Sequence, residues 1–125
     1  MKIVISASGR DLESMLDPRF GRCPYFLVID TETEECQPVP NPGMMAGGGA
    51  GIQAAQEVVR QGAKAVITGQ CGPNAYDVLR SAGVKILQAP VEPVRQVLER
   101  YRRGELEELT APGPAHHGMR GWGRR

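Results

Sequence analysis

Short apolar runs alternate with striped, half-polar segments along the chain. Five runs are rich in strand-forming residues and end at turn residues, which predicts β-strands. They cover residues 2–7, 25–30, 35–39, 65–68 and 84–87. Three other segments carry apolar residues three and four positions apart, which is typical of helices. Their stripes run from Ile52 to Val59, from Ala75 to Ala82 and from Val91 to Tyr101.

The order of these elements predicts an α/β fold. A tight polar turn at residues 31–35 makes the second and third strands an antiparallel hairpin. Each of the last two strands follows a helix, which implies right-handed parallel crossovers. Strand two should therefore run against the other strands of a mixed sheet, with the three helices packed on it.

The chain divides into one domain and a tail. Residues 1–109 contain every predicted element and are long enough to bury a core without disulfides. Residues 110–125 are rich in Gly, Pro, His and Arg and show no apolar period, so we expect a flexible tail.

Composition argues against several partners. Fifteen basic residues nearly balance 14 acidic ones, for a net charge of +1, so no nucleic acid partner is expected. No apolar run approaches the roughly 20 residues that span a membrane. The first strand is too short for a signal peptide. We therefore expect a cytoplasmic protein with reduced thiols and no membrane association.

The predicted topology gathers several loops at one end of the sheet. They are residues 8–23, 40–51, 69–74 and 88–92. All three helices start at the same end, and open α/β sheets bind ligands outside the carboxyl ends of their parallel strands. Cys23 and Cys71 fall on this rim, whereas Cys36 falls at the opposite end.

The chemistry of this rim favours an anion that binds soft ligands. Helix starts and a glycine-rich loop expose backbone N–H groups, Arg19 and Arg22 add positive charge, and thiolates suit iron–sulfur units, copper(I) or zinc. A metal–sulfur cluster fits these features, and so does a phosphate-bearing small molecule. The candidate binding residues are Arg19, Arg22, Cys23, Met44, Met45, Gly47, Gly48, Gly49, Gly51, Gly69, Cys71 and Gly72. The candidate metal ligands are Cys23, Cys71, His116 and His117.

Each feature also has a purely structural interpretation. A lone cysteine commonly packs as a small buried hydrophobe. The glycine loop could be a flexible segment, the two arginines could be surface charge, and Met44 and Met45 could form an apolar lid. The functional interpretation depends on their convergence at one end of the sheet.

Signatures of common enzymes are missing from the sequence. The glycine loop lacks the Lys-Ser/Thr of a P-loop, and no GxGxxG follows the first strand. The only histidines, His116 and His117, lie in the tail, which argues against a His-assisted nucleophile on a rigid frame. We therefore do not expect an ordinary enzyme, and a hydrolase is poorly supported.

Three segments resemble a known family. They are Asp17–Phe26 (DPRFGRCPYF), Gly49–Gly51 at the start of a helix, and Val66–Gly69 followed by Gly72–Ala75. Their order and spacing resemble the dinitrogenase iron–molybdenum cofactor biosynthesis (NifX-like) family over about residues 1–109. The Arg-Phe-Gly-Arg-Cys segment is the most specific of the three.

This resemblance implies a ribonuclease H-like three-layer fold with a five-stranded mixed sheet in the order 3-2-1-4-5, which agrees with the element order. It also implies non-catalytic binding or carrying of an iron–molybdenum or related metal–sulfur cluster, with cluster-assembly or recipient proteins as partners. It does not establish a role in nitrogen fixation. Two alternatives stay open: a small-molecule or phosphate-binding regulatory module, and an adaptor for a metal-cluster enzyme or assembly ATPase.

Overall fold

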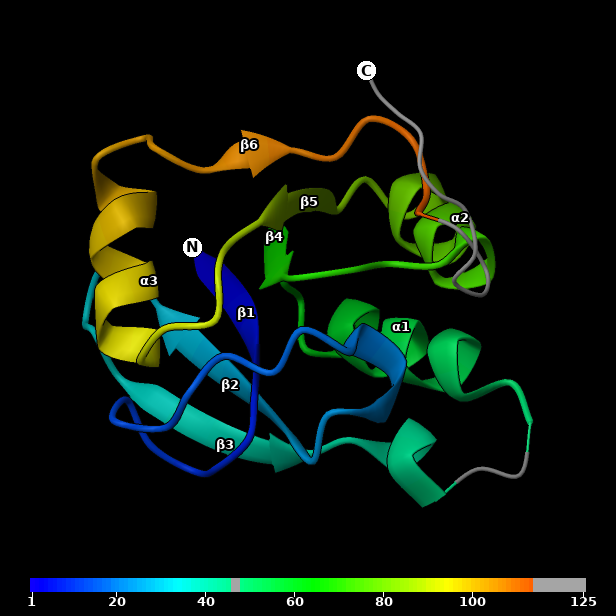
Figure 1. Cartoon of the computed structure of the whole chain (residues 1–125), viewed down its shortest axis with the longest axis horizontal. Helices are drawn as coiled ribbons and strands as arrows, with labels where there is room; N and C mark the ends of the chain where they lie inside the picture. Colours follow the sequence, from blue (N-terminus) through cyan, green and yellow to red (C-terminus); the bar gives the residue numbers. More distant parts are fainter. Residues whose placement is uncertain (46–47, 114–125) are drawn as a thin grey trace.

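One open mixed sheet forms the centre of the molecule (Figure 1). The computed structural model describes residues 1–45 and 48–113. The strands are β1 (Lys2–Ala7), β2 (Tyr25–Asp30), β3 (Cys36–Pro40), β4 (Ala65–Thr68), β5 (Lys85–Gln88) and β6 (Glu107–Glu108). They lie in the order β3-β2-β1-β4-β5-β6, which confirms the predicted order of the first five.

Strand directions follow the predicted connections. β1 pairs antiparallel with β2, from Lys2 opposite Asp30 to Ala7 opposite Tyr25, and parallel with β4. β4 and β5 are also parallel, and β2 and β3 form the antiparallel hairpin. The carboxyl ends of β1, β4 and β5 therefore share one end of the sheet.

The expectation of five strands is wrong, because β6 adds a sixth at the β5 edge. β6 consists of two exposed glutamates and carries no apolar alternation that could have predicted a strand. Its pairing is stabilised by the next residue, since Leu109 N donates to Ile86 O at 2.7 Å and the Leu109 side chain packs on the core.

Three helices cover the two faces of the sheet. They are α1 (Ala50–Arg60), α2 (Pro73–Ser81) and α3 (Val94–Arg102), and the short 3-10 turns are η1 (Phe20–Arg22) and η2 (Pro42–Met45). The first and second helices pack on one face and α3 packs on the other, which makes three layers. The third helix begins three residues later than its stripe suggests, because backbone bonds pair Glu92 and Val94 with the loop before β2.

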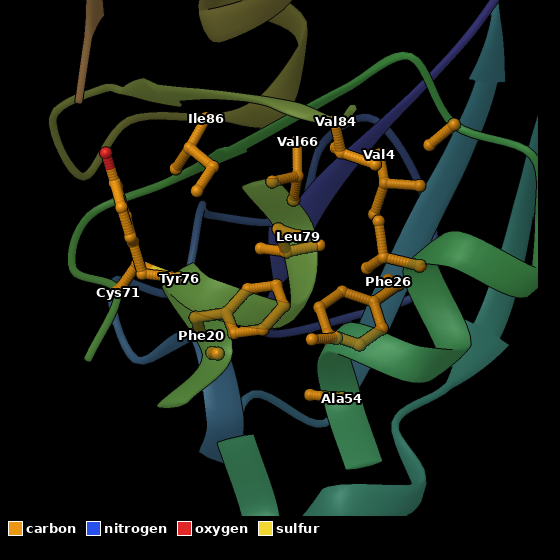
Figure 2. Close-up of a cluster of buried hydrophobic side chains, with 14 of the residues drawn as sticks. Val4, Phe20, Phe26, Ala54, Val66, Cys71, Tyr76, Leu79, Val84 and Ile86 are labelled. Carbon is orange, nitrogen blue, oxygen red and sulfur yellow. The ribbon is translucent and has the colours of Figure 1, made fainter. Parts of the chain in front are cut away.

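Alternation along the strands builds a core on each face. Val4 of β1 and Val66 of β4 pack with Leu79 of α2 on one face (Figure 2). Ile5 and Ile67, the next residues along these strands, pack on the α3 side. Because the two cores lie on the faces of the sheet, the loops at its ends are available to form binding sites.

Candidate functional site

A cavity of about 330 Å³ opens where α1 and α2 begin. Its walls come from three loops at the carboxyl end of the sheet, the end predicted to bind a ligand. The lining residues are Arg19, Phe20, Gly21, Gly49, Ala50, Gly51, Ile52, Gln70, Gly72, Pro73, Asn74 and Ala75.

The starts of α1 and α2 bring backbone amides to the rim of this cavity. Gly49 and Gly72 occupy the N-cap positions of α1 and α2, and no side chain caps either helix. The first turn of a helix has amides without intrahelical acceptors, and its dipole presents partial positive charge. Both helix starts line the cavity, so it offers N–H donors to an anion.

Close backbone packing brings these loops together. A Cβ on Gly21 would lie 3.1 Å from the backbone N and Cα of Gly51, so η1 sits directly against the start of α1. A Cβ on Gly69 would lie 2.5 Å from Pro18 Cβ, and Gln70 N donates to Pro18 O at 2.8 Å. Glycine therefore lets three separate loops meet around one cavity.

Among the described residues, Arg19 is the one charged side chain in the lining. Asp17 Oδ1 accepts bonds from Arg19 N at 2.9 Å and Nε at 3.1 Å, and Asp17 Oδ2 accepts one from Nη2 at 2.9 Å. These bonds hold the pKa of the Asp17 carboxyl below its usual value. Asp17 is almost fully buried, whereas two thirds of the Arg19 side chain is exposed. Asp17 thus holds the Arg19 guanidinium in place at the wall of the cavity.

Asn41 joins the two loops that flank α1, and sequence reasoning missed it. Its Nδ2 donates to Cys23 O at 2.9 Å and to Gly21 O at 3.2 Å. Its Oδ1 accepts a bond from Gly43 N at 2.8 Å. The Pro-Asn-Pro-Gly context of Asn41 suggests only a turn. Its burial, at 4 % exposure, is visible only once the loops are folded together.

The two candidate thiols lie in the core beneath the cavity rather than in its lining. Cys23 and Cys71 are both in the cluster between the sheet and the first two helices, at 0 % and 1 % exposure (Figure 2 labels Cys71). Burial raises the pKa of each thiol to about 12, and for Cys23 the nearby Asp17 charge adds to this effect. Both are therefore neutral thiols at neutral pH.

The remaining predicted residues divide into three groups. Gly49, Gly51 and Gly72 line the cavity with Arg19. Met44 and Met45 are exposed on η2 and do not line it; Gly48 is exposed, Gly69 lies against Pro18, and Arg22 ends η1. Gly47, His116 and His117 lie outside the described residues.

Side chains of the described residues do not gather into a ready metal site. Within residues 1–45 and 48–113, no group of three or more His, Cys, Asp and Glu could hold a metal ion. Gln70, Asn74 and Ile52 line the cavity but were not predicted to do so. Asn74 lies within the Gly72–Ala75 segment quoted above, and the polar residues that follow a buried strand were the available signal.

No helix in the described part of the chain is both long enough and apolar enough to cross a membrane.

Comparison with known proteins gives consistent results. The orange protein from Desulfovibrio gigas, solved in its apo form, superimposes with a TM-score of 0.86 and 36% identity, over 90% of this chain and 95% of that one. A Thermotoga protein proposed to be NifB superimposes with a TM-score of 0.80 and 33% identity, over 92% of this chain and 98% of that one. An uncharacterized protein of Methanocaldococcus jannaschii, MJ0580, is 27% identical over 97 residues, which are 75% of this chain and 82% of that protein.

The family model described as "dinitrogenase iron-molybdenum cofactor" matches residues 1–104. That match spans both cores and every residue that lines the cavity. The chain therefore belongs to the dinitrogenase iron–molybdenum cofactor family.

Proposed function

We propose that this protein binds and carries an anionic metal–sulfur cluster, of the iron–molybdenum or a related type, in the cavity between α1 and α2. The observation that carries the proposal is the convergence of two helix starts without side-chain caps on one cavity. Family membership supplies the class of cargo. Among residues 1–45 and 48–113, the cavity lining offers no carboxylate, histidine or thiol that would serve as an acid, base or nucleophile, which favours a carrier over a catalyst.

Amides and one guanidinium suit an anion that keeps its own sulfur ligands. Such donors bind by charge and hydrogen bonding and form no coordinate bond to a metal. The Arg19 guanidinium supplies the side-chain charge, and Asp17 offsets part of that charge while holding it in place. The cargo should therefore enter and leave without a ligand exchange on the metal.

Thiolate ligation by Cys23 or Cys71 is the competing arrangement within the same function. It requires a buried thiol to lose its proton and to reach the cavity, against a pKa raised to about 12. This cost favours the amides as the main contacts. In this arrangement the residues around the cavity include Arg22, Met44, Met45, Gly48 and Gly69. Roles for Gly47, His116 and His117 stay predictions.

A phosphate-bearing small molecule is the second candidate ligand, because helix-start amides recognise phosphate by the same bonds. For the leading proposal, we expect cluster-assembly and recipient proteins as partners, in the cytoplasm. The ribonuclease H-like relation of the fold, an adaptor role and the limits of the tail stay predictions.

The first experiment is anaerobic reconstitution with iron, sulfide and molybdate, followed by visible absorption and metal analysis. Gly72→Asp and Gly72→Asn form the matched pair, because a Cβ at Gly72 meets nothing within 4 Å and both residues are good N-caps. Either variant caps α2 and stabilises it, but only the aspartate places negative charge at the cavity.

We expect the wild type to take up metal stoichiometrically, with charge-transfer bands. Gly72→Asp should lose most of this loading, Gly72→Asn should retain more, and Arg19→Gln should weaken it. Arg60→Gln, at the far end of α1, is the charge control and should load normally. If loading survives Gly72→Asp but is lost in Cys23→Ala or Cys71→Ala, the cluster is held by thiolate ligation and not by the backbone amides. Failure to load, together with binding of inorganic phosphate, would favour the regulatory module.

A further inference from the structure

The three lysines of this chain lie together at the end of the sheet opposite the cavity. Lys2 and Lys85 begin β1 and β5, and Lys64 immediately precedes β4. Backbone bonds join them in a row, since Lys64 N donates to Lys2 O at 2.8 Å and Lys85 N donates to Lys64 O at 3.0 Å. The amino ends of all three parallel strands therefore carry a lysine.

Two of these lysines line a second cavity, also of about 330 Å³, between the sheet and the end of α3. Lys64 and Lys85 supply its charged side chains, and Met1, whose terminal ammonium pairs with Glu32, also lines it. Its apolar part includes the buried Leu87 and the half-buried Leu106 and Tyr101. Figure 1 shows the N-terminus at this end of the sheet, close to α3.

Lys2 is excluded from this cavity by the alternation of β1. It shares its side of the strand with Val4, which packs in the core on the α1 and α2 face. Ile3, on the other side, packs in the α3 core. Lys2 lines a separate hollow with Val28 and Cys36 instead. It therefore has the same charge at the same end of the sheet but faces away.

The lysine side chains differ from the arginines in their partners. Seven arginines of the described part form ion pairs: Arg19, Arg60, Arg80, Arg95, Arg100, Arg102 and Arg103. Within residues 1–45 and 48–113, no ion pair or side-chain hydrogen bond joins Lys64 or Lys85 to another residue. Their ammonium groups are left to water or to a ligand.

Negative groups close to this cavity are already engaged. Glu105, which lies in sequence between the lining residues Gly104 and Leu106, faces Arg100 at 3.8 Å and Arg103 at 3.9 Å. The carbonyls that end α3 also have partners, because Gly104 N donates to Tyr101 O and Glu105 N donates to Arg100 O, both at 3.0 Å. No carboxylate of residues 1–45 and 48–113 lines the cavity.

We propose that this cavity, the lysine cavity, is a second binding site, for a small organic anion with a phosphate or carboxylate group on an apolar body. Lys64 and Lys85 bind the anionic group, and Leu87, Leu106 and the Tyr101 ring pack against the apolar body. Lysine ammoniums are mobile point charges, so two of them adapt to either anion. The site does not depend on the proposed cluster binding, because the two cavities share no residue.

The test is a titration of the isotope-labelled protein, followed by NMR of its backbone amides. The probes are phenyl phosphate, phenylacetate and inorganic phosphate. The variants are Lys64→Gln with Lys85→Gln in one chain, and Lys2→Gln as the matched control. All three lysines are exposed, so each variant should fold as the wild type does.

We expect phenyl phosphate, phenylacetate or both to shift amides at residues 64–65, 85–87 and 101–106, and the tighter of the two identifies the anionic group. Loss of both ammonium groups should weaken that binding about tenfold or more, because both charged side-chain contacts to the anionic group are removed. Lys2→Gln should bind within about twofold of wild type, since Lys2 faces away.

Three results would overturn the proposal. Neither organic probe shifts these amides; the double variant binds as tightly as the wild type; or Lys2→Gln weakens binding as much as the double variant does, which would indicate diffuse attraction. If inorganic phosphate binds as tightly as phenyl phosphate, the proposed contact of Leu87, Leu106 and Tyr101 with an apolar body is wrong.

Discussion

The two ends of the sheet present positive charge to solvent in different ways. At the carboxyl end, the donors are backbone amides at the starts of α1 and α2, held by loops that meet at Gly21 and Gly69. At the amino end, the donors are the exposed side chains of Lys64 and Lys85. The amides are fixed by the packing of the loops, whereas the lysine ammonium groups lie on exposed side chains.

This difference separates stability from binding. Residues at the contacts between the carboxyl-end loops, such as Gly69 and Asn41, hold the cavity in shape, so substitutions at these contacts should cost folding free energy as well as affinity. The ammonium groups of Lys64 and Lys85 have no hydrogen-bond or ion-pair partner among the described residues, so their replacement by glutamine should affect binding alone. Three substitutions at the carboxyl end probe how closely its cavity is tied to the fold.

Gly69→Ala should have the largest effect. A Cβ there would lie 2.5 Å from Pro18 Cβ and 2.7 Å from Pro18 Cα, so the backbone of one loop must move. We expect a loss of about 2–3 kcal/mol in the free energy of unfolding, measured by urea denaturation. Gly48→Ala is the control, because its Cβ meets nothing within 4 Å, and it should stay within about 0.5 kcal/mol of wild type. Equal stability of the two variants would mean that the loops are not tightly joined.

Asn41→Ala should follow, with a loss of about 2 kcal/mol. The change leaves the buried amide of Gly43 and the carbonyl of Cys23 without their partner. Asn74→Ala removes the same side chain from an exposed position in the cavity lining and should change stability little. Thermal unfolding of both variants provides the comparison. An Asn41→Ala protein as stable as Asn74→Ala would contradict the role of Asn41 in joining the loops.

Asp17→Asn should have the smallest effect, and it should depend on pH. Arg19 lowers the pKa of Asp17 in the folded protein, so the folded state releases that proton more readily than the unfolded chain does. The resulting stability is present above the unfolded pKa of about 4 and is lost as pH falls through the lowered folded value.

We expect Asp17→Asn to be about 1 kcal/mol less stable than wild type at neutral pH, a small value because Arg19 is largely exposed. The difference should shrink in acid. Urea denaturation at several pH values measures it, and a gap that stays constant down to pH 2 would show that the ion pair contributes nothing.

Sequence periodicity was sufficient for the first five strands and the three helices, because the central strands alternate between two cores. Ile3 and Val4 point to opposite faces, and the helices between β3 and β5 leave few possible connections. β6 could not be found in this way, because its glutamates pair through the backbone and Leu109 alone anchors them.

The candidate site was predicted by position better than by residue. Topology placed Arg19, Gly49, Gly51 and Gly72 at the carboxyl end of the sheet, and all four line the cavity there. The same reasoning cannot tell a rim residue that faces the cavity from one that faces the core, which is why Cys71 was named and Asn74 was not. Burial depends on how the loops pack, and that packing is set by contacts such as those of Asn41.

The most direct test of the central claim is backbone-amide NMR of the anaerobically reconstituted protein beside the metal-free protein. The account predicts that amide resonances at residues 50–52 and 74–75 shift or broaden, while those of Lys64 and Lys85 stay unchanged. Two results would contradict cluster binding at the starts of α1 and α2. Either the shifts are centred on Lys64 and Lys85, or the reconstituted and metal-free proteins give the same amide resonances at both ends of the sheet.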